Sequence, residues 1–317
     1  MSKTRDRVLG ALAVAAAASM WGTLGYLAKL LYAQGVSFEA LVAFRAVFGW
    51  FAVAGFLLVT QGVSTLRVGK RDLLFLFFMG LFGVAGFYLF YFYTVQESTI
   101  GTAAILLYSF PALVVILARI FLGESLTPPK ILALILTVGG VFLVAGAYDP
   151  ANLEVNPFVL LTGLLAALCF GLYPIFGKPV TGRLNPSTIL SYALAFGAMI
   201  LLVTAIPTLD TLVGLPPGYY ALLLLMAVAH TAFGYALYTF GIRRLEAGQV
   251  AIIATLEAVV AGILGAALLG ETLTFLKILG GLLVLSGAAL AQIRLRKPRL
   301  RGYLAAQEPE QGGESDS

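Results

Sequence analysis

The sequence is poor in the residues that build covalent, metal and charged sites. It contains one cysteine, Cys169, and one histidine, His230, among 317 residues. A single cysteine excludes a disulfide within the chain, and without a Cys/His cluster nothing indicates a metal site or another cofactor. Charged residues make up 11% of the chain, against about 25% in ordinary soluble domains, and 60% are hydrophobic. Such a chain cannot keep its apolar surface inside one water-soluble core, so it belongs in a lipid bilayer.

Apolar runs recur along the chain at the length that spans a bilayer, about 20 residues for roughly 30 Å of hydrocarbon. The first run follows Lys3, Arg5 and Arg7, as in a signal peptide, but continues to about Tyr32. It is too long for the apolar region of such a peptide, and we interpret it as a retained helix. The sequence predicts an all-α polytopic membrane protein with ten transmembrane helices, at approximately residues 8–32, 38–60, 72–94, 99–121, 129–147, 157–178, 187–206, 217–240, 247–269 and 275–293.

Basic residues are distributed unequally over the loops between these runs. With both termini cytoplasmic, the positive-inside rule is satisfied almost everywhere. The inside loops and the C-terminal end carry Arg67, Lys70, Arg71, Lys130, Arg183, Arg243, Arg244, Arg294, Arg296, Lys297, Arg299 and Arg301. The outside loops carry Glu97, Asp149, Glu154 and Asp210, with Lys277 as the basic residue near them. We expect a multi-pass protein of the cytoplasmic (inner) membrane, and this distribution explains the basic residues without a nucleic-acid partner.

The two halves of the chain repeat each other. Gly123-Glu124-Ser125-Leu126-Thr127 and Gly270-Glu271-Thr272-Leu273-Thr274 lie 147 positions apart, and in the same register Tyr88 and Tyr91 fall on Tyr235 and Tyr238. Five helices per half is an odd number, so the second half enters the membrane from the opposite face, as in the inverted repeats of many secondary transporters. We expect five-helix repeats at 8–147 and 157–293, followed by a disordered cytoplasmic tail at 303–317.

Motifs along both halves resemble those of the drug/metabolite transporter superfamily, in its EamA-like branch. They are Trp21-Gly22 with Lys29, Arg45, Ser109-Phe110-Pro111 and the first Gly-Glu turn, then Leu256-Glu257 and the second turn. The resemblance covers both predicted repeats. It implies a ten-helix carrier that exports amino acids, other metabolites or drugs, with the third, fourth, eighth and ninth helices along the path. Members often carry proline after the ninth-helix glutamate, whereas this chain has Ala258, so the residue that would break the helix is missing.

The Gly-Glu turn shared by the halves is interpreted as structural. Gly123, just past a helix end, can take the left-handed conformation that closes a C-terminus. Thr127 and Thr274 can cap the helices that follow, with Pro128 at a favoured first position. We expect the glutamate of the turn to lie in the polar interface of the membrane.

Two ionisable residues lie near the predicted centre of the membrane. Glu257 is about eleven residues into the ninth helix, where inserting an ionisable residue costs about 2.5–3.5 kcal/mol and usually marks a function. It is a candidate for substrate binding or proton coupling, and the alternative is a protonated glutamate bonded to a neighbouring helix. His230, in the eighth helix, is either a proton relay or substrate donor, or an interhelical donor. In the repeat register these residues face Phe110 and Gly83.

Arg45 lies in the second helix, deep enough to need a partner or a water-filled cleft. Its guanidinium group could bind a substrate carboxylate through two parallel hydrogen bonds. The alternative is an ion-paired or snorkelling anchor, because the EamA-like branch carries arginine here whatever the substrate. Lys29 and Lys178 lie nearer the helix ends, where long side chains reach water. We interpret both lysines as anchors.

Aromatic residues are the remaining candidates for the substrate or proton site. Tyr88 and Tyr91 are one turn apart, as are Tyr235 and Tyr238, and such pairs can wall a cavity with rings and hydroxyl groups. Trp21 and Tyr108 share this interpretation. The alternative for all six is a lipid-facing or interfacial aromatic belt.

The sequence therefore predicts a secondary-active transporter that exports a small organic solute by alternating access. Its expected partners are this solute, the lipid bilayer and protons as a candidate coupling ion, and it acts as a monomer or homodimer without a cofactor. An uncoupled facilitator or channel-like uniporter is the alternative. An intramembrane enzyme is a remote alternative, because the chain has a single histidine and a single cysteine and no Gly-x-Ser-x-Gly motif.

Overall fold

The computed structural model describes residues 3–98, 100–149, 156–269 and 274–291, and within these ranges the chain forms helices and turns without a β-strand. Eight helical spans are long and apolar enough to cross a membrane. Two shorter apolar helices, α8 (Pro128–Val144) and α15 (Phe275–Leu290), occupy the fifth and tenth predicted runs. The predicted all-α architecture with ten transmembrane helices is confirmed.

The first half of the chain contains five spans, three of them interrupted. Besides α8, its elements are α1 (Lys3–Trp21), α2 (Leu24–Tyr32), α3 (Phe38–Gln61), the 3₁₀ turn η1 (Val63–Leu66), α4 (Lys70–Gly80), the π-helical η2 (Leu81–Gly86), α5 (Phe87–Glu97), α6 (Ile100–Leu107) and α7 (Phe110–Phe121). The pairs α1–α2 and α6–α7 form the first and fourth spans, and α4, η2 and α5 form the third.

The second half has the same order of five spans, but its first span is continuous and only the third and fourth are interrupted. Besides α15, its elements are α9 (Pro157–Gly177), α10 (Pro186–Ala205), the 3₁₀ helix η4 (Ile206–Leu212), α11 (Pro217–Leu225), the π-helical η5 (Met226–Phe233), α12 (Gly234–Arg244), α13 (Ala247–Ala254) and α14 (Leu256–Leu269). Proline begins α9, α10 and α11, because its missing N–H has no intrahelical partner at the first position anyway.

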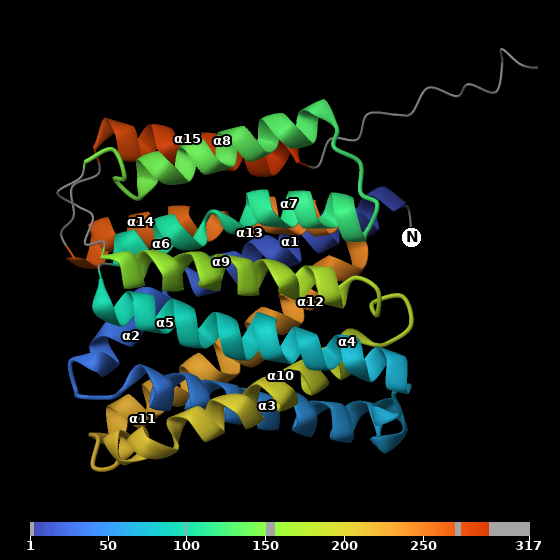
Figure 1. Ribbon diagram of the computed structural model, residues 1–317, viewed down its shortest axis with the longest axis vertical. Helices are drawn as coiled ribbons and strands as arrows, with labels where there is room; N and C mark the ends of the chain where they lie inside the picture. Colours follow the sequence, from blue (N-terminus) through green and yellow to red (C-terminus); the bar gives the residue numbers. More distant parts are fainter. Residues whose placement is uncertain (1–2, 99, 150–155, 270–273, 292–317) are drawn as a thin grey trace, which may run out of the picture.

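Spans that correspond in the repeat pack against each other at the two ends of the molecule. α8 lies along α15 at one end, and α3 lies along α10 at the other (Figure 1). Glycines permit the close packing of α8 against α15, because a Cβ on Gly280 would lie 2.5 Å from the carbonyl oxygen of Gly140. Small residues of this kind let helices approach closely inside a membrane. The other spans fill the space between the two pairs and carry the candidate residues.

The ninth span is broken at Thr255, two residues before Glu257, although Ala258 stands where related chains carry proline. The Thr255 hydroxyl donates to the carbonyl oxygen of Ile252 at 2.6 Å, and the N–H of Ala258 bonds to the carbonyl oxygen of Thr255 at 3.0 Å. A threonine side chain that competes for backbone groups can end a helix in this way. Glu257 consequently lies in the first turn of α14, where the helix dipole favours a negative charge.

The first copy of the Gly-Glu turn differs from the expectation in one respect. Gly123 has the predicted left-handed conformation, with φ +67°. Thr127, however, makes no side-chain cap, whereas Thr274 accepts such a bond from the N–H of Lys277 at 3.3 Å. The Glu124 side chain is 8% exposed. Residues 270–273, Glu154, the basic residues after 291 and the predicted tail at 303–317 lie outside the described residues.

Candidate functional site

Arg45 projects from α3 into the interior and is fully buried. Its Nη2 donates to Thr231 Oγ1 at 3.2 Å and to the Tyr88 hydroxyl at 3.4 Å. The guanidinium carbon lies 4.8 Å from the centre of the Tyr88 ring and 4.9 Å from that of Phe92, within cation–π range. Arg45 therefore neither snorkels nor forms an ion pair with an acidic residue of the described ranges.

The guanidinium group of Arg45 is only partly satisfied. Its Nε and Nη1 have no hydrogen-bond partner among the residues that the structure describes. A guanidinium carries five N–H donors in a fixed fork, and a buried donor of a charged group without an acceptor is costly. The arrangement leaves two nitrogens of a buried cation, Nε and Nη1, able to donate to an oxyanion.

His230 lies in η5 and contacts the break in the first span. Its Nε2 is 2.8 Å from Thr23 Oγ1, and its Nδ1 is 3.4 Å from the carbonyl oxygen of Leu225. The carbonyl oxygen of His230 accepts a bond from Trp21 Nε1 at 2.9 Å. In the described part of the chain no hydrogen bond joins His230 to Glu257.

Trp21, Tyr235 and Tyr238 form an aromatic cluster with Phe170 and Tyr173. The Trp21 ring centre is 5.2 Å from those of Tyr235 and Tyr238 and 5.8 Å from that of Phe170, and Tyr173 lies 5.1 Å from Tyr235. The Tyr235 hydroxyl donates across the halves to the carbonyl oxygen of Gly83 at 3.4 Å, whereas the buried Tyr238 hydroxyl has no partner in the described ranges.

Tyr88, Tyr91 and Tyr108 are also buried, with at most 5% of the residue exposed. Tyr88 joins Arg45 to the aromatic cluster, because its ring centre lies 6.2 Å from that of Tyr235. None of the six predicted aromatic residues faces lipid, and the alternative of a lipid-facing belt is therefore wrong. Burial also places the two repeat-related tyrosine pairs in one interior region.

Glu257 is 8% exposed and lies among tyrosines. Its side chain lies in the neighbourhood of Tyr91, Tyr108 and Tyr238, and Tyr91 also lies in the neighbourhood of Arg45. Arg45 and Glu257 nevertheless form no ion pair with each other. The interior thus holds one cationic and one acidic group that do not neutralise each other directly.

Several contributors to this region were not predicted from the sequence. Thr231 bonds Arg45, Thr23 bonds His230, and Phe170 and Tyr173 complete the aromatic cluster. Threonine is frequent in transmembrane helices and often bonds its own backbone, so it carries no distinct signal. Only the position of Thr231 beside His230 in an otherwise apolar run could have singled it out.

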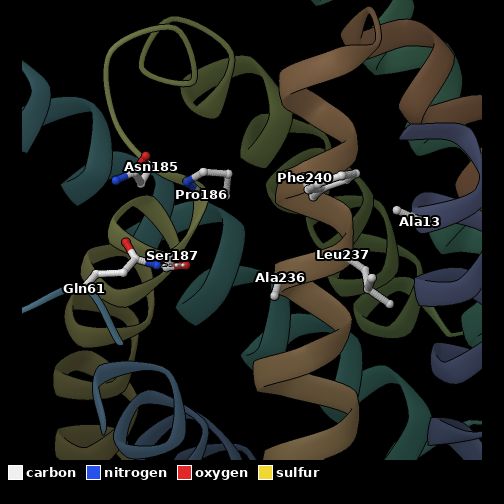
Figure 2. A pocket seen from close by; sticks show the side chains of 8 residues that line it. All are labelled: Ala13, Gln61, Asn185, Pro186, Ser187, Ala236, Leu237 and Phe240. Atoms are coloured by element: carbon white, nitrogen blue, oxygen red, sulfur yellow. Dashed lines mark hydrogen bonds between the residues drawn. The ribbon is translucent and has the colours of Figure 1, made fainter. Parts of the chain in front are cut away.

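A cavity of about 560 Å³ is lined by residues of α1, α3, α10 and α12. Figure 2 shows Gln61, Asn185 and Ser187 on one side of it and Ala13, Leu237 and Phe240 on the other. None of the predicted candidates lines this cavity. The described residues also contain no group of three or more His, Cys, Asp or Glu side chains that could hold a metal ion.

Lys29, in α2, and Lys178, just after α9, each bind backbone carbonyl groups of their own half. Lys29 Nζ donates to the carbonyl oxygen of Ser98 at 3.0 Å, and Lys178 Nζ donates to those of Ile242, at 2.7 Å, and Leu245. Ser98 and Leu245 correspond in the repeat register. Each lysine holds the link that precedes the fourth or ninth span, because an ammonium group can satisfy several carbonyls at once.

Known proteins resemble the chain over most of its length. It is 27% identical to an uncharacterized transporter of Archaeoglobus fulgidus, over 89% of this chain and 96% of that protein. It is 26% identical to the threonine/homoserine exporter RhtA of Salmonella typhimurium (73% and 75% covered), and 25% identical to a probable terminal-alkyne amino-acid exporter of Streptantibioticus cattleyicolor (72% and 76%).

A solved crystal structure aligns with a TM-score of 0.72 at 18% identity, covering 89% of this chain and 96% of the other, which shows a shared fold. The profile of the EamA-like transporter family matches twice, at residues 8–146 and 157–292, in agreement with the two predicted repeats. With both halves matched, the chain belongs to the EamA-like transporter family.

Proposed function

We propose that the chain is a secondary-active transporter that exports a small amphipathic organic solute, with an amino acid as the leading class. The family membership and the names of two relatives, a threonine/homoserine exporter and a probable terminal-alkyne amino-acid exporter, support export of a small solute. The two repeats, at 8–147 and 157–293, move against each other so that the interior site opens to one side of the cytoplasmic membrane at a time.

The observation that supports this proposal most directly is that the buried guanidinium group of Arg45 is only partly hydrogen-bonded. Its Nη2 is fixed by two neutral hydroxyl groups, while Nε and Nη1 have no partner among the described residues. A carboxylate oxygen can accept from either of these two free groups and would supply the missing negative charge. Arg45 is therefore the proposed receptor of the solute carboxylate.

Glu257 is the proposed partner of a substrate amine or of a coupling proton. Both Glu257 and Arg45 lie in the neighbourhood of Tyr91, and in this proposal a zwitterion binds with its carboxylate at Arg45 and its amine at Glu257. The aromatic cluster around Trp21 offers rings to the apolar part of the solute. His230 and Tyr88 complete the proposed site through their hydrogen bonds with Trp21 and Arg45, together with the buried Tyr108.

Both termini are proposed to be cytoplasmic. The described basic residues support this orientation. The start of α4, the link between α9 and α10 and the end of α12 lie at the same end of the molecule as the start of α1 (Figure 1). These segments carry Arg71, Arg183 and Arg244, and Arg244 pairs with Asp6 of α1. Transport is then directed from the end that carries these residues to the end that carries Glu97 and Asp210.

Thermal stabilisation of the purified protein tests the site. We expect L-phenylalanine to raise the unfolding temperature more than 2-phenylethylamine or 3-phenylpropanoate, which lack one charged group each. Arg45→Gln should remove the stabilisation by phenylalanine and by phenylpropanoate. Equal stabilisation of wild type and Arg45→Gln would refute the assignment of Arg45. L-Threonine and L-leucine, each with its matched amine and acid, extend the series to smaller and aliphatic side chains.

Transport kinetics separate a coupled carrier from an uncoupled facilitator. In proteoliposomes a carrier saturates, shows counterflow and accumulates solute against its gradient when a proton gradient is imposed. A channel-like uniporter shows no counterflow, and a facilitator without coupling shows no accumulation.

A further inference from the structure

The turn after α7, in the first half, reaches the start of α13, in the second half. Glu124 Oε1 accepts a hydrogen bond from the N–H of Ala247 at 2.6 Å, and Oε2 accepts one from Gly248 at 3.2 Å. Both N–H groups belong to the first turn of α13, where the helix dipole attracts an anion. One carboxylate of the first repeat thus binds the N-terminus of a helix of the second repeat.

Lys130 adds a charged connection to the same place. Its Nζ lies 2.8 Å from Glu124 Oε2 and 3.1 Å from Glu246 Oε2, and the side chains of Lys130 and Glu124 are 5% and 8% exposed. A buried ion pair gains Coulomb energy but loses hydration, so its net stability is small while the removal of one partner is costly. Because its net stability is small, this ion-pair contact can open when Glu124, Lys130 and Glu246 become hydrated together.

The start of α13 does not depend on Glu124 for its own fold. The N–H of Glu246 is bonded within the second half, to Gln249 Oε1 at 3.3 Å, and Lys178 holds the carbonyl oxygens of Ile242 and Leu245. The link between α12 and α13 is therefore a preformed element, to which Glu124 and Lys130 attach the other repeat. Directly beneath it, Val115 of α7 is buried with Ile252 of α13 in a small apolar cluster.

We propose that Glu124 and Lys130 form a reversible latch that closes one end of the transport path. In the described conformation the latch joins the two repeats between the fourth and ninth spans, and it must open for the solute to enter from that end. The inference rests on the proposed alternating-access transport, and the proposed topology makes this end the cytoplasmic one.

The accessibility of a buried thiol tests the latch without a transport assay. In a Cys169→Ala background, Val115→Cys places a nearly isosteric thiol under the latch. We expect Glu124→Gln to accelerate labelling of this thiol by a water-soluble maleimide by about tenfold in detergent-solubilised protein, because charge-assisted bonds are lost. Unchanged labelling in a folded Glu124→Gln variant would overturn the proposal.

Gly248→Ala is a second variant that keeps every charged residue. A Cβ on Gly248 would lie 2.6 Å from Lys130 Cε, so the ammonium group must leave its place and labelling should accelerate as well. Asp72→Asn is the matched control. It removes the exposed ion pair with Arg183, which also joins the two halves, and should leave labelling unchanged because exposed pairs contribute little.

The two proposals fail in different ways. Accelerated labelling in a protein that transports none of the tested solutes supports the latch and counts against the proposed function. Transport with labelling that neither Glu124→Gln nor Gly248→Ala alters supports the function and refutes the latch. Acceleration of labelling by Asp72→Asn to the same degree would also refute it, because the effect would then be a general loosening of this end.

Discussion

Gly22 packs directly against the backbone of Glu257. A Cβ at position 22 would lie 2.8 Å from the Glu257 carbonyl oxygen and 2.8 Å from Val260 Cβ. The two residues lie at the breaks of the first and ninth spans, between α1 and α2 and between α13 and α14. This contact holds the two breaks together, and it lies at the backbone positions that carry the side chains of Thr23 and Glu257.

Replacing Gly22 should therefore separate the two breaks. Gly22→Ala inserts a methyl group where backbone occupies the space, and overpacking of this kind costs about 1–3 kcal/mol. We expect a lower unfolding temperature and reduced solute transport. Gly55→Ala is the matched control, because a Cβ at Gly55 has no neighbour within 4 Å. If Gly22→Ala behaves like Gly55→Ala, the two breaks do not need this contact.

Glu257→Gln tests proton coupling at the buried acid. Glutamine keeps the shape and most hydrogen-bonding capacity of the side chain but cannot exchange a proton. We expect normal expression with transport that is abolished or no longer responds to a pH gradient, measured as uptake into proteoliposomes. Glu97→Gln, at an exposed position, should retain the wild-type response. Gradient-dependent uptake in Glu257→Gln at the wild-type rate would rule out the coupling role.

The sequence predicts the ten spans of the fold but not the breaks within them. Ten apolar runs and their repeat determine the spans, because length and composition decide what can cross a bilayer. The break at Thr255 was not predicted, since it arises from a hydroxyl bonded to the carbonyl oxygen of Ile252 where proline is absent. The π-helical η2 and η5 also cannot be recognised from composition. A hydrogen bond from Tyr235 of α12 to Gly83 of η2 crosses the two halves.

The site could be predicted as a set of residues but not as an arrangement. Arg45 and Tyr88 were candidates because a charge or hydroxyl group inside a membrane needs a reason. Their common partner Thr231 is 186 positions from Arg45, and this proximity depends on how α3 packs against η5. The Gly-Glu turn was interpreted as local, whereas Glu124 contacts Ala247 in the other repeat, 123 positions away.

Thr231→Val tests whether the orientation of Arg45 matters. Thr231 Oγ1 accepts from Arg45 at 3.2 Å and lies 3.3 Å from the Tyr88 hydroxyl. Valine keeps the volume but removes this acceptor, so the guanidinium group is held less firmly, and a hydrogen bond to a charged group contributes about 1.5–3 kcal/mol. We expect about tenfold weaker binding of a carboxylate-bearing solute, measured by thermal stabilisation or as a raised KM.

Thr94→Val is the control for this change. Thr94 is equally buried and donates to Thr162 Oγ1 at 3.0 Å, away from Arg45. It should lower stability while leaving the solute affinity unchanged. An equal loss of affinity in both variants would show that Thr231 acts through general stability and not through Arg45.

Lys178→Met and Lys29→Met test whether the two lysines act each within its own repeat. Methionine retains the length of the side chain but cannot donate, so the carbonyl oxygens of Ile242 and Leu245, or of Ser98, lose the bonds that lysine supplies, at a cost of about 1–3 kcal/mol. Hydrogen exchange measured by mass spectrometry should rise in the link from Ile242 to Glu246 for Lys178→Met and around Ser98 for Lys29→Met.

The hydrogen bonds of Lys29 and of Lys178 each stay inside one repeat. Neither substitution should therefore raise hydrogen exchange in the link of the other half. Arg183→Gln, which removes an exposed side chain of the same end, should leave exchange in both links unchanged. If Lys178→Met raised exchange equally around Ser98, the two links would be coupled through the whole fold. The two lysines would then belong to one cooperative unit. A change in the opening of the Glu124–Lys130 latch in Lys178→Met could then not be assigned to local loosening of the α12–α13 link.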